Sequence, residues 1–450
     1  MKKTVIILFV ILLSIAFASC KDQDEQTIYR TNVREIDELL IEEQRRSFLY
    51  FWETSNSDPD SPGYGLTRDR YPGSPGVASV AAVGYALAAI PIGIENEWIT
   101  YEEGYERAIG TLETLLSLNR YQGFFLHFLG METGLRVWNS EVSVIDTALL
   151  LGGALFAGQY FGGQIEEKAI EIYDDVDWSW YVDPINRFYM GYDPDAEIFS
   201  GAWDGYAEQL MMYVLAAGSN TNPTSDALYR VFKFNVNQRK AGYISHDHPE
   251  LNTASFYYTY GGQLFTHQYS HAYLDFRNIN DRDGVNWFDN AVTATQASYN
   301  FAQEFSYKYK SFGVDSWGLS ASDGPNGYKA YGSPPATNYH HDGTVAAYAA
   351  ISSVVYLEEE ALNAFHHFMT FESFWGEYGL KASYNLGLHE GYFDESISSK
   401  TPYFSDDYVG IDKGITMLMI ENYRSDFIWE VFMDIDEIQR GMDVLGFQNR

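Results

Sequence analysis

The sequence has only one cysteine, Cys20, among its 450 residues, and it has few basic residues. A single cysteine excludes internal disulfides, thiolate metal sites and, at this N-terminal position, a cysteine nucleophile. Lys and Arg total 29 against 62 Asp and Glu, which gives a net charge of −33 and a pI near 4.5. Nucleic-acid phosphates require basic patches, so we expect no nucleic-acid partner, whereas neutral and cationic ligands remain open.

Several catalytic motifs are also absent. The chain contains no Gly-x-Ser-x-Gly nucleophile elbow, no phosphate-binding loop and no dinucleotide fingerprint. It also lacks the His-Glu-x-x-His pattern of zinc hydrolases. We therefore expect neither a cofactor nor a metal.

The N-terminus has the pattern of a targeting segment. Met1-Lys2-Lys3 is basic, Val5 to Phe17 is apolar but short for a membrane span, and small residues precede Cys20. This resembles a bacterial lipoprotein signal with Cys20 as the lipidated residue. The acidic run from Lys21 to Glu25 is similar to the export tag of surface lipoproteins in Bacteroidetes, although a solvated linker has the same composition.

These features predict the organisation of the chain. We expect a signal peptide over residues 1–20, a linker over 21–33 and one domain over 34–450, because no low-complexity linker follows Thr27. The expected location is the bacterial outer membrane, held by the lipid anchor and exposed at the surface, with the periplasmic face as the alternative.

Aromatic residues are abundant, with 36 Tyr, 29 Phe and 10 Trp. The simpler interpretation is an aromatic-rich core. The second is a cleft in which aromatic rings stack on the C–H faces of sugars.

About twelve helical segments alternate between amphipathic and apolar on every side. The amphipathic segments are 34–53, 101–118, 165–173, 225–234, 287–305 and 358–370. The apolar segments are 77–92, 140–161, 203–217, 266–276, 344–356 and 409–420. An inner ring of helices is buried on all sides while an outer ring faces water, so the pattern predicts an all-α (α/α)6 toroid, six helical hairpins in a double ring with a loop-rich cleft rim. An α-solenoid is the alternative, but no fixed-period repeat supports it.

Three of the apolar segments begin with carboxylates. These are Glu141 and Asp146, Asp204 and Glu208, and Asp407 and Asp412. Glu208 is expected on the first turns of a helix that has no polar side, where a carboxylate is either paired or used in chemistry. Parallel inner helices gather their N-termini at one end, so we expect these acids to converge.

An aromatic cleft floored by two or three acids fits glycosidic hydrolysis. One carboxyl group protonates the leaving oxygen, and a second activates water or attacks directly. His267 and His271, four residues apart, could instead bind a metal, but hydrogen bonding to sugar hydroxyls or beside Asp275 is favoured. Asp69 and Arg70 form either an ion pair within a loop or part of the cleft rim.

Several sequence blocks resemble a known family. They are Gly65–Arg70 (GLTRDR), Gly123–Phe128 (GFFLHF), Glu141–Ala148 (EVSVIDTA), Thr266–Ala272 (THQYSHA), Trp317–Pro325 (WGLSASDGP) and Gly410–Gly414 (GIDKG). In this order, from about residue 34 to the end, they are similar to the bacterial glucoamylase-like family. The resemblance implies an (α/α)6 glycoside hydrolase of the kind found in glycoside hydrolase family 144, an inverting endo-β-1,2-glucanase that releases sophoro-oligosaccharides.

The resemblance also implies site residues. Glu208 is the expected general acid and Asp412 the expected base, with Asp146 as a third catalytic acid that, like Glu141, orients substrate or water. The expected substrate-binding residues are Asp69, Arg70, Trp138, Glu141, Trp203, Tyr206, His267, Gln268, His271, Trp317, Asp323 and Tyr408.

Two departures from the family pattern bear on substrate preference. Val345 and the residues after it replace a usual proline, and Lys381 replaces an acid. A glycosidase of different linkage specificity is therefore one alternative. The other is a non-catalytic glycan-binding lipoprotein that delivers oligosaccharide to neighbouring uptake proteins.

Overall fold

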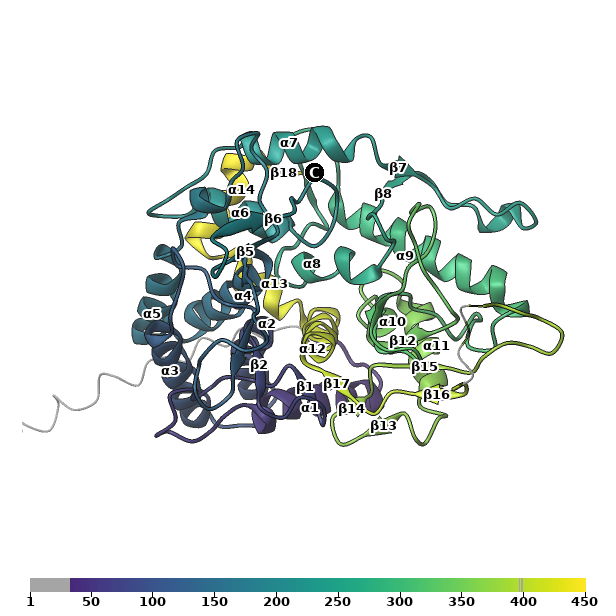
Figure 1. The fold of residues 1–450 in the computed structure, drawn as a ribbon, viewed down its shortest axis with the longest axis horizontal. Helices are drawn as coiled ribbons and strands as arrows, with labels where there is room; N and C mark the ends of the chain where they lie inside the picture. The colour runs from purple at the N-terminus through teal and green to yellow at the C-terminus, as the bar shows by residue number, and fades with distance from the viewer. Residues whose placement is uncertain (1–32, 396, 398–399) are drawn as a thin grey trace, which may run out of the picture.

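The computed structural model describes residues 33–395, 397 and 400–450. The predicted signal peptide, Cys20 and nearly all of the predicted linker lie outside the described residues. Within them the chain forms fourteen α-helices and short antiparallel strands arranged as a ring (Figure 1).

Six helices form the inner ring. They are α2 (Val80–Glu95), α4 (Val144–Phe161), α6 (Leu210–Gly218), α8 (Tyr269–Tyr273), α10 (Ala347–Ile351) and α12 (Gly410–Ser425). Every residue of α6, α8 and α10 is buried, as expected for helices with neighbours on all sides. The ring closes where α12 packs against α2.

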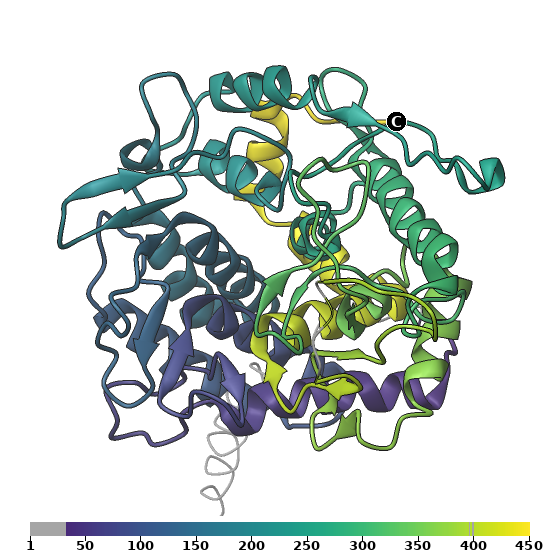
Figure 2. The same cartoon turned by 45° about the vertical axis from the view of Figure 1, so that its right-hand side comes forward.

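Six further helices lie around the circumference of the ring (Figure 1). They are α1 (Glu38–Thr54), α3 (Tyr101–Ser117), α5 (Gly163–Asp174), α7 (Ala227–Val236), α9 (Trp287–Glu304) and α11 (Glu358–Phe368). Inner and outer helices alternate along the chain, so the predicted double ring is confirmed. Figure 2 shows α1 crossing beneath α12, with which it packs.

The C-terminal helices α13 (Phe427–Met433) and α14 (Asp436–Leu445) complete the fold, and α14 packs on α6. Four single turns of 3-10 helix accompany the α-helices. They are η1 (Trp178–Tyr181), η2 (Pro249–Leu251), η3 (Leu264–His267) and η4 (Phe305–Tyr307).

Three inner segments are shorter than the sequence indicates. The expected helix over 203–217 begins only at Leu210, and the expected helix over 344–356 is α10 alone. The segment 266–276 is divided into η3 and α8, so His267 and His271 do not share one continuous helix. Polar side chains that bond to nearby backbone groups compete with helix formation at these ends.

Short strands join the helices at the cleft side of the ring. In chain order they are β1 (Arg70–Tyr71), β2 (Val77–Ser79), β3 (Phe128–Gly130), β4 (Val142–Ser143), β5 (Gly191–Asp193), β6 (Ile198–Ser200), β7 (Lys240–Ala241), β8 (Phe256–Tyr257), β9 (Ile279–Asn280), β10 (Ala321–Ser322), β11 (Lys329–Ala330), β12 (Val345–Ala346), β13 (Trp375–Gly376), β14 (Gly379–Leu380), β15 (Ser383–Asn385), β16 (Tyr403–Phe404), β17 (Tyr408–Val409) and β18 (Gln448–Asn449).

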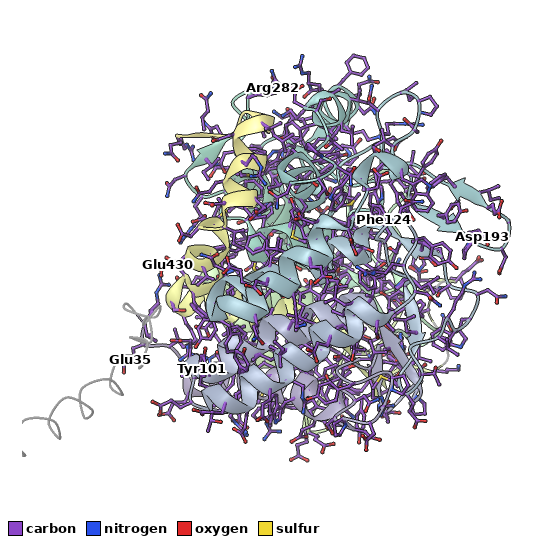
Figure 3. The ribbon with its side chains drawn as sticks, turned by 90° about the vertical axis from the view of Figure 1, so that its left-hand side faces the viewer. Glu35, Tyr101, Phe124, Asp193, Arg282 and Glu430 are labelled. Atoms are coloured by element: carbon purple, nitrogen blue, oxygen red, sulfur yellow. The ribbon has the colours of Figure 1, made fainter. Side chains whose placement is uncertain are left out.

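Four of these strands lead directly into inner helices: β2 into α2, β4 into α4, β12 into α10 and β17 into α12. Their partners are β3 for β2, β5 for β4, β15 for β12 and β1 for β17. The β5–β6 hairpin, marked by Asp193, projects on the side of the molecule opposite Glu35 and Glu430 (Figure 3). The strand pairs thus fix the starts of the inner helices at one face.

The helix α4 is also long and apolar enough to cross a membrane, and among the described residues it is the one helix that is. Most of it is buried inside the protein, and it packs closely on α2. Its composition therefore reflects a place in the core.

The packing of α2 against α4 depends on two glycines. A Cβ atom added to Gly153 would lie 1.8 Å from the carbonyl oxygen of Gly84, and one added to Gly84 would lie 2.5 Å from the carbonyl oxygen of Leu149. Glycine has no Cβ, so the two backbones approach more closely than any other residue allows.

We expect Gly153→Ala to lower the free energy of unfolding by about 3 kcal/mol, because the added methyl group forces two inner helices apart. Urea denaturation measures the loss. Gly313→Ala is the matched control, since a Cβ there meets no atom within 4 Å. Equal stability of the two variants would contradict the close approach.

Candidate active site

The first part of the site is the start of α4. Asp146 lies in the first turn, where its backbone N–H donates to Ser143 Oγ at 3.2 Å and its carboxylate accepts from the same hydroxyl at 2.5 Å. This N-cap fixes the side chain, and the helix dipole favours a carboxylate there.

His127 connects Asp146 to Glu141. Its Nδ1 lies 2.9 Å from Glu141 Oε1, and its Nε2 lies 3.6 Å from Asp146 Oδ1. Burial lowers the proton affinity of the ring, but the charges of Asp146, Glu141 and Asp69 outweigh burial and raise the pKa of His127 to about 9. The imidazole is therefore a cation at neutral pH.

The same three side chains are the one group of metal-ligand type found among the described residues, with ligand atoms within 4.8 Å of one another. A histidine binds a metal through a neutral nitrogen. Because His127 holds a proton between two carboxylates, the arrangement favours an ion-pair network.

The second part of the site is the start of α12. Asp412 is 2% exposed, and neither of its carboxylate oxygens has a hydrogen-bond partner among the described residues. Burial raises the pKa of Asp412 well above its usual range, and the charges of Asp323 and Asp69 raise it further, against the opposing effects of Arg70 and Lys413. An unpaired buried carboxyl group is costly, so its retention points to chemistry.

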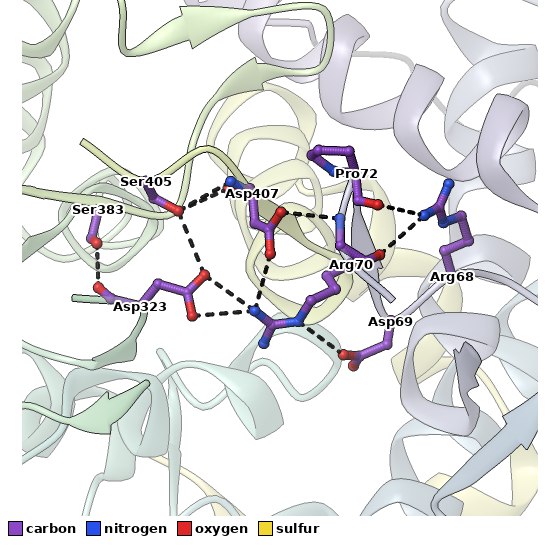
Figure 4. A network of polar contacts seen from close by, with 9 residues as sticks. Arg68, Asp69, Arg70, Pro72, Asp323, Ser383, Ser405 and Asp407 are labelled. Carbon is purple, nitrogen blue, oxygen red and sulfur yellow. Dashed lines mark hydrogen bonds and ion pairs between the residues drawn. The ribbon is translucent and has the colours of Figure 1, made fainter. Parts of the chain in front are cut away.

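Arg70, whose charge acts on Asp412, lies at the centre of an acidic network (Figure 4). Its Nη1 donates to both oxygens of Asp323 at 3.2 Å and to Asp407 Oδ2 at 3.2 Å, and its Nε lies 3.4 Å from Asp69 Oδ2. The backbone N–H of Gly73 donates to Asp407. One guanidinium thus ties β1 to the loops after β10 and before β17.

Glu208 lies two residues before α6, not on its first turns as the sequence indicates. The Gln209 side chain folds back on this segment, accepting from Ala207 N–H and donating to the Gly205 carbonyl, which stops the helix from extending. Burial raises the pKa of Glu208 to about 7, its own backbone N–H opposes the rise, and the charge of Asp146 adds to it.

Tyr85 of α2 lies where the three parts meet. Its phenol is buried without a hydrogen-bond partner in the described part of the chain. Its pKa is raised by burial and also by the charges of Asp412, Asp146 and Glu208. The charges of all three carboxyl groups therefore act on one phenol.

Comparison with known proteins assigns the chain to a family. The family profile for Glycoamylase, described as "Putative glucoamylase", matches residues 200–436, more than half of the chain. The chain is a member of the Glycoamylase family. The matched region contains Glu208, Asp323, Asp407 and Asp412.

Solved structures share the fold over most of the Glycoamylase-family chain. An endo-β-1,2-glucanase from Chitinophaga pinensis, in complex with sophorotriose and glucose, is 27% identical with a TM-score of 0.79 over 92% of this chain and 99% of that one. A β-1,2-glucanase from Parabacteroides distasonis is 25% identical, with a TM-score of 0.78 over 92% of this chain and 60% of that one.

A curated relative is similar in sequence. It is the exo β-1,2-glucooligosaccharide sophorohydrolase (non-reducing end) of Parabacteroides distasonis, 27% identical over 95% of this chain. The Glycoamylase-family chain spans about three fifths of the length of this relative, 61%.

Among the expected substrate-binding residues, Asp69, Arg70, Asp323 and Glu141 lie in the networks described above. Trp138 is 60% exposed and packs edge-on against Phe128, whose ring stacks on His127 at 3.8 Å. Two successive ring contacts therefore connect the exposed Trp138 to His127, which lies between Glu141 and Asp146.

Four other expected residues bond or pack within the interior. Gln268 donates to the Ala349 carbonyl and to Ser353 Oγ, and Trp317 Nε1 donates to the Glu360 carbonyl. Tyr408 packs against the rings of Tyr71 and Tyr378. Tyr206 stacks on Trp287 at 5.1 Å. These contacts are with the protein itself, so the structure gives the four side chains a role in packing.

The two histidines and Trp203 are buried as well. His267 packs against Tyr206 and Phe256, and His271 against Phe276 and Tyr356. Burial lowers the pKa of both His267 and His271 to about 3, so the two rings are neutral. Their position in the interior differs from the expected contact with sugar hydroxyls.

Sequence reasoning missed His127 and Tyr85 as site residues, whereas Asp407 was among the acids expected to converge. His127 lies in the block Gly123–Phe128 that carries the family resemblance, so a signal was present. Tyr85 lies within an apolar run and gives no signal, because only the folded ring brings it among the acids.

The raised pKa of His127 predicts a pH-dependent contribution to stability. The folded value is about 9 and the ordinary value 6.5, so the stabilisation is complete below pH 6.5 and is lost as the pH rises through 9. Allowing for solvent screening, the difference in unfolding free energy between wild type and His127→Gln shrinks by about 1–2 kcal/mol from pH 6 to pH 10.

Denaturant titrations across this range measure the difference. His248→Gln is the control, because His248 is an exposed histidine beside Glu250. A gap between wild type and His127→Gln that stays constant with pH would show that His127 is not held as a cation.

Proposed function

We propose that this protein is a glycoside hydrolase that cleaves β-1,2-glucan internally, releasing sophoro-oligosaccharides with inversion. The observation that carries the proposal is that the charges of Glu208, Asp146 and Asp412 all act on the buried phenol of Tyr85, and that burial raises the pKa of both Glu208 and Asp412. The activities named for the Chitinophaga and Parabacteroides relatives supply the substrate class.

Glu208 acts as the general acid in this proposal. A carboxyl group with a pKa near 7 still holds a proton in slightly acidic solution, and it can give that proton to the leaving glycosidic oxygen. Asp146 supports this role because its charge favours the protonated form of Glu208.

Asp412 acts as the base that receives a proton from the attacking water. Neither of its carboxylate oxygens has a hydrogen-bond partner among the described residues, and Arg70 and Lys413 oppose the rise that burial causes in its pKa and so favour its ionised form. The Arg70 guanidinium fixes Asp323 and Asp407 by hydrogen bonds, and the charge of Asp323 acts on Asp412.

Binding of the glucan is proposed at Asp69, Arg70, Glu141 and Trp138, which lie at the partly exposed edge of the site. A neutral polysaccharide suits a chain whose net charge is −33. The lipidation of Cys20, attachment to the outer membrane with surface exposure, and contact with glycan-uptake proteins remain proposals from the N-terminal sequence.

Substitution of the two acids tests the roles. We expect Glu208→Gln and Asp412→Asn each to lower turnover of β-1,2-glucan by about 10²–10⁴-fold while keeping the fold. Circular dichroism checks the fold, and Glu102→Gln on the exposed face of α3 is the control for charge removal.

An activated substrate separates acid from base. Fluoride leaves without protonation, so β-sophorosyl fluoride restores turnover in the Glu208→Gln variant and leaves Asp412→Asn impaired. The reverse pattern would exchange the two roles. Wild-type hydrolysis of β-1,2-glucan by Glu208→Gln would remove Glu208 from the mechanism.

Product analysis tests the substrate and the mode of attack. Linear β-1,2-glucan is expected to yield sophoro-oligosaccharides of several lengths early in the reaction, with the α-anomer formed first, as ¹H NMR measures. Sophorose as the one early product would establish exo attack. No new reducing ends from β-1,2-, β-1,3- or β-1,4-glucan would establish a glycan-binding protein.

A further inference from the structure

A buried ion pair lies directly behind the proposed base. Lys413 follows Asp412 in α12, and its Nζ is 2.5 Å from Glu43 Oε1 of α1. The exposed fractions of the two side chains are 4% and 1%. Glu43 also accepts from Leu380 N–H at 2.8 Å and from Trp375 Nε1 at 3.1 Å, so its position is fixed.

Such a pair is a poor source of stability. Removing two charges from water costs several kcal/mol for each ion, and an apolar pair of similar volume often serves the fold equally well. The attachment of α1 to α12 already has other contacts, including Gln44 Nε2 to Glu421 Oε2 at 2.6 Å. Stability alone therefore does not explain why a charged pair occupies this position.

The pair and the base share one cavity. A small cavity of about 10 Å³ is lined by Glu43, Lys413 and Asp412, together with Tyr348 of α10 and Lys381. Asp412 has no hydrogen-bond partner for either oxygen. No other side chain of the described residues therefore fixes the charge of Asp412 by a direct bond, and its ionisation depends on the charges around the cavity.

We propose that Glu43 and Lys413 are positioning residues for hydrolysis: Lys413 supplies a cation that favours the ionised form of Asp412, and Glu43 limits that effect by pairing with the same ammonium group. The proposal rests on the proposed role of Asp412 as the base. Neither residue touches the substrate.

The other groups that face Asp412 do not replace Lys413 as the cation that favours its ionised form. Asp323 and Asp69 oppose its ionisation, and Arg70, the second cation that favours it, is shared among three carboxylates. Lys381 lines the same cavity, and its Nζ lies 3.8 Å from Asp406 Oδ1. Further titratable neighbours are the phenols of Tyr50, Tyr85, Tyr269, Tyr328 and Tyr348, all with raised pKa values. Neutral phenols add no charge, so we expect the ionisation of Asp412 to depend on the Glu43–Lys413 pair.

Two variants are expected to act in opposite directions. Glu43→Gln frees the charge of Lys413, so Asp412 becomes its counter-ion and its titration midpoint falls by at least about half a pH unit. Glu43→Gln combined with Lys413→Met removes the cation, so the midpoint rises by a similar amount. A purely structural pair would change stability without opposite shifts.

The midpoint is measured on the protein labelled with [4-¹³C]aspartate, through the resonance that disappears in Asp412→Asn. The pH profile of kcat/KM provides the second readout, because its limb for the base is expected to follow the same shifts. The doubly substituted variant has no unpaired buried charge at this pair. If Glu43→Gln alone does not fold, the shift in the doubly substituted variant tests the proposal by itself.

A second buried pair serves as the control. Lys233 Nζ lies 2.6 Å from Asp281 Oδ2, equally buried but away from Asp412, and Lys233→Met with Asp281→Asn is expected to leave the midpoint unchanged. Unchanged or parallel midpoints in the two Glu43 variants overturn the inference. Full activity of Asp412→Asn overturns the proposed function instead, and the NMR shifts still report on the pair.

Discussion

The desolvation of two carboxyl groups at the starts of inner helices is the constraint on which the site depends. Asp412 is buried without a hydrogen-bond partner among the described residues, and Glu208 has a pKa near 7 because burial disfavours its charge. The double ring creates this condition, since an inner helix has protein on every side. The surrounding networks, centred on Arg70 and His127, hold further charges at fixed places around the two acids.

Much of the fold could be predicted because burial leaves a pattern in the sequence. The alternation of amphipathic and apolar segments follows directly from the two rings, and Asp146 and Asp412 occupy the third position of α4 and α12. The start of α6 could not be predicted in the same way. Its boundary depends on the Gln209 side chain, whose two hydrogen bonds to the local backbone stand in place of the start of the expected helix.

Site residues that lie far apart in the sequence and meet only in the folded ring of helices were harder to predict. Tyr85 looks like any core tyrosine until α4, α12 and the segment before α6 surround it. His267 and His271 show the opposite case, because histidines at helical spacing suggest a binding face, yet both rings lie among aromatic side chains. The spacing of two histidines along the chain does not show whether their side chains face a binding cleft or the aromatic interior.

The pairing of β1 with β17 joins Arg70 to Val409, two residues separated by most of the chain. Every contact between Arg70 and Asp407 depends on this closure. A ribosome therefore has to synthesise nearly the whole polypeptide before the two ends of the acidic network can meet. Until then the ion pair between Arg70 and Asp407 cannot form.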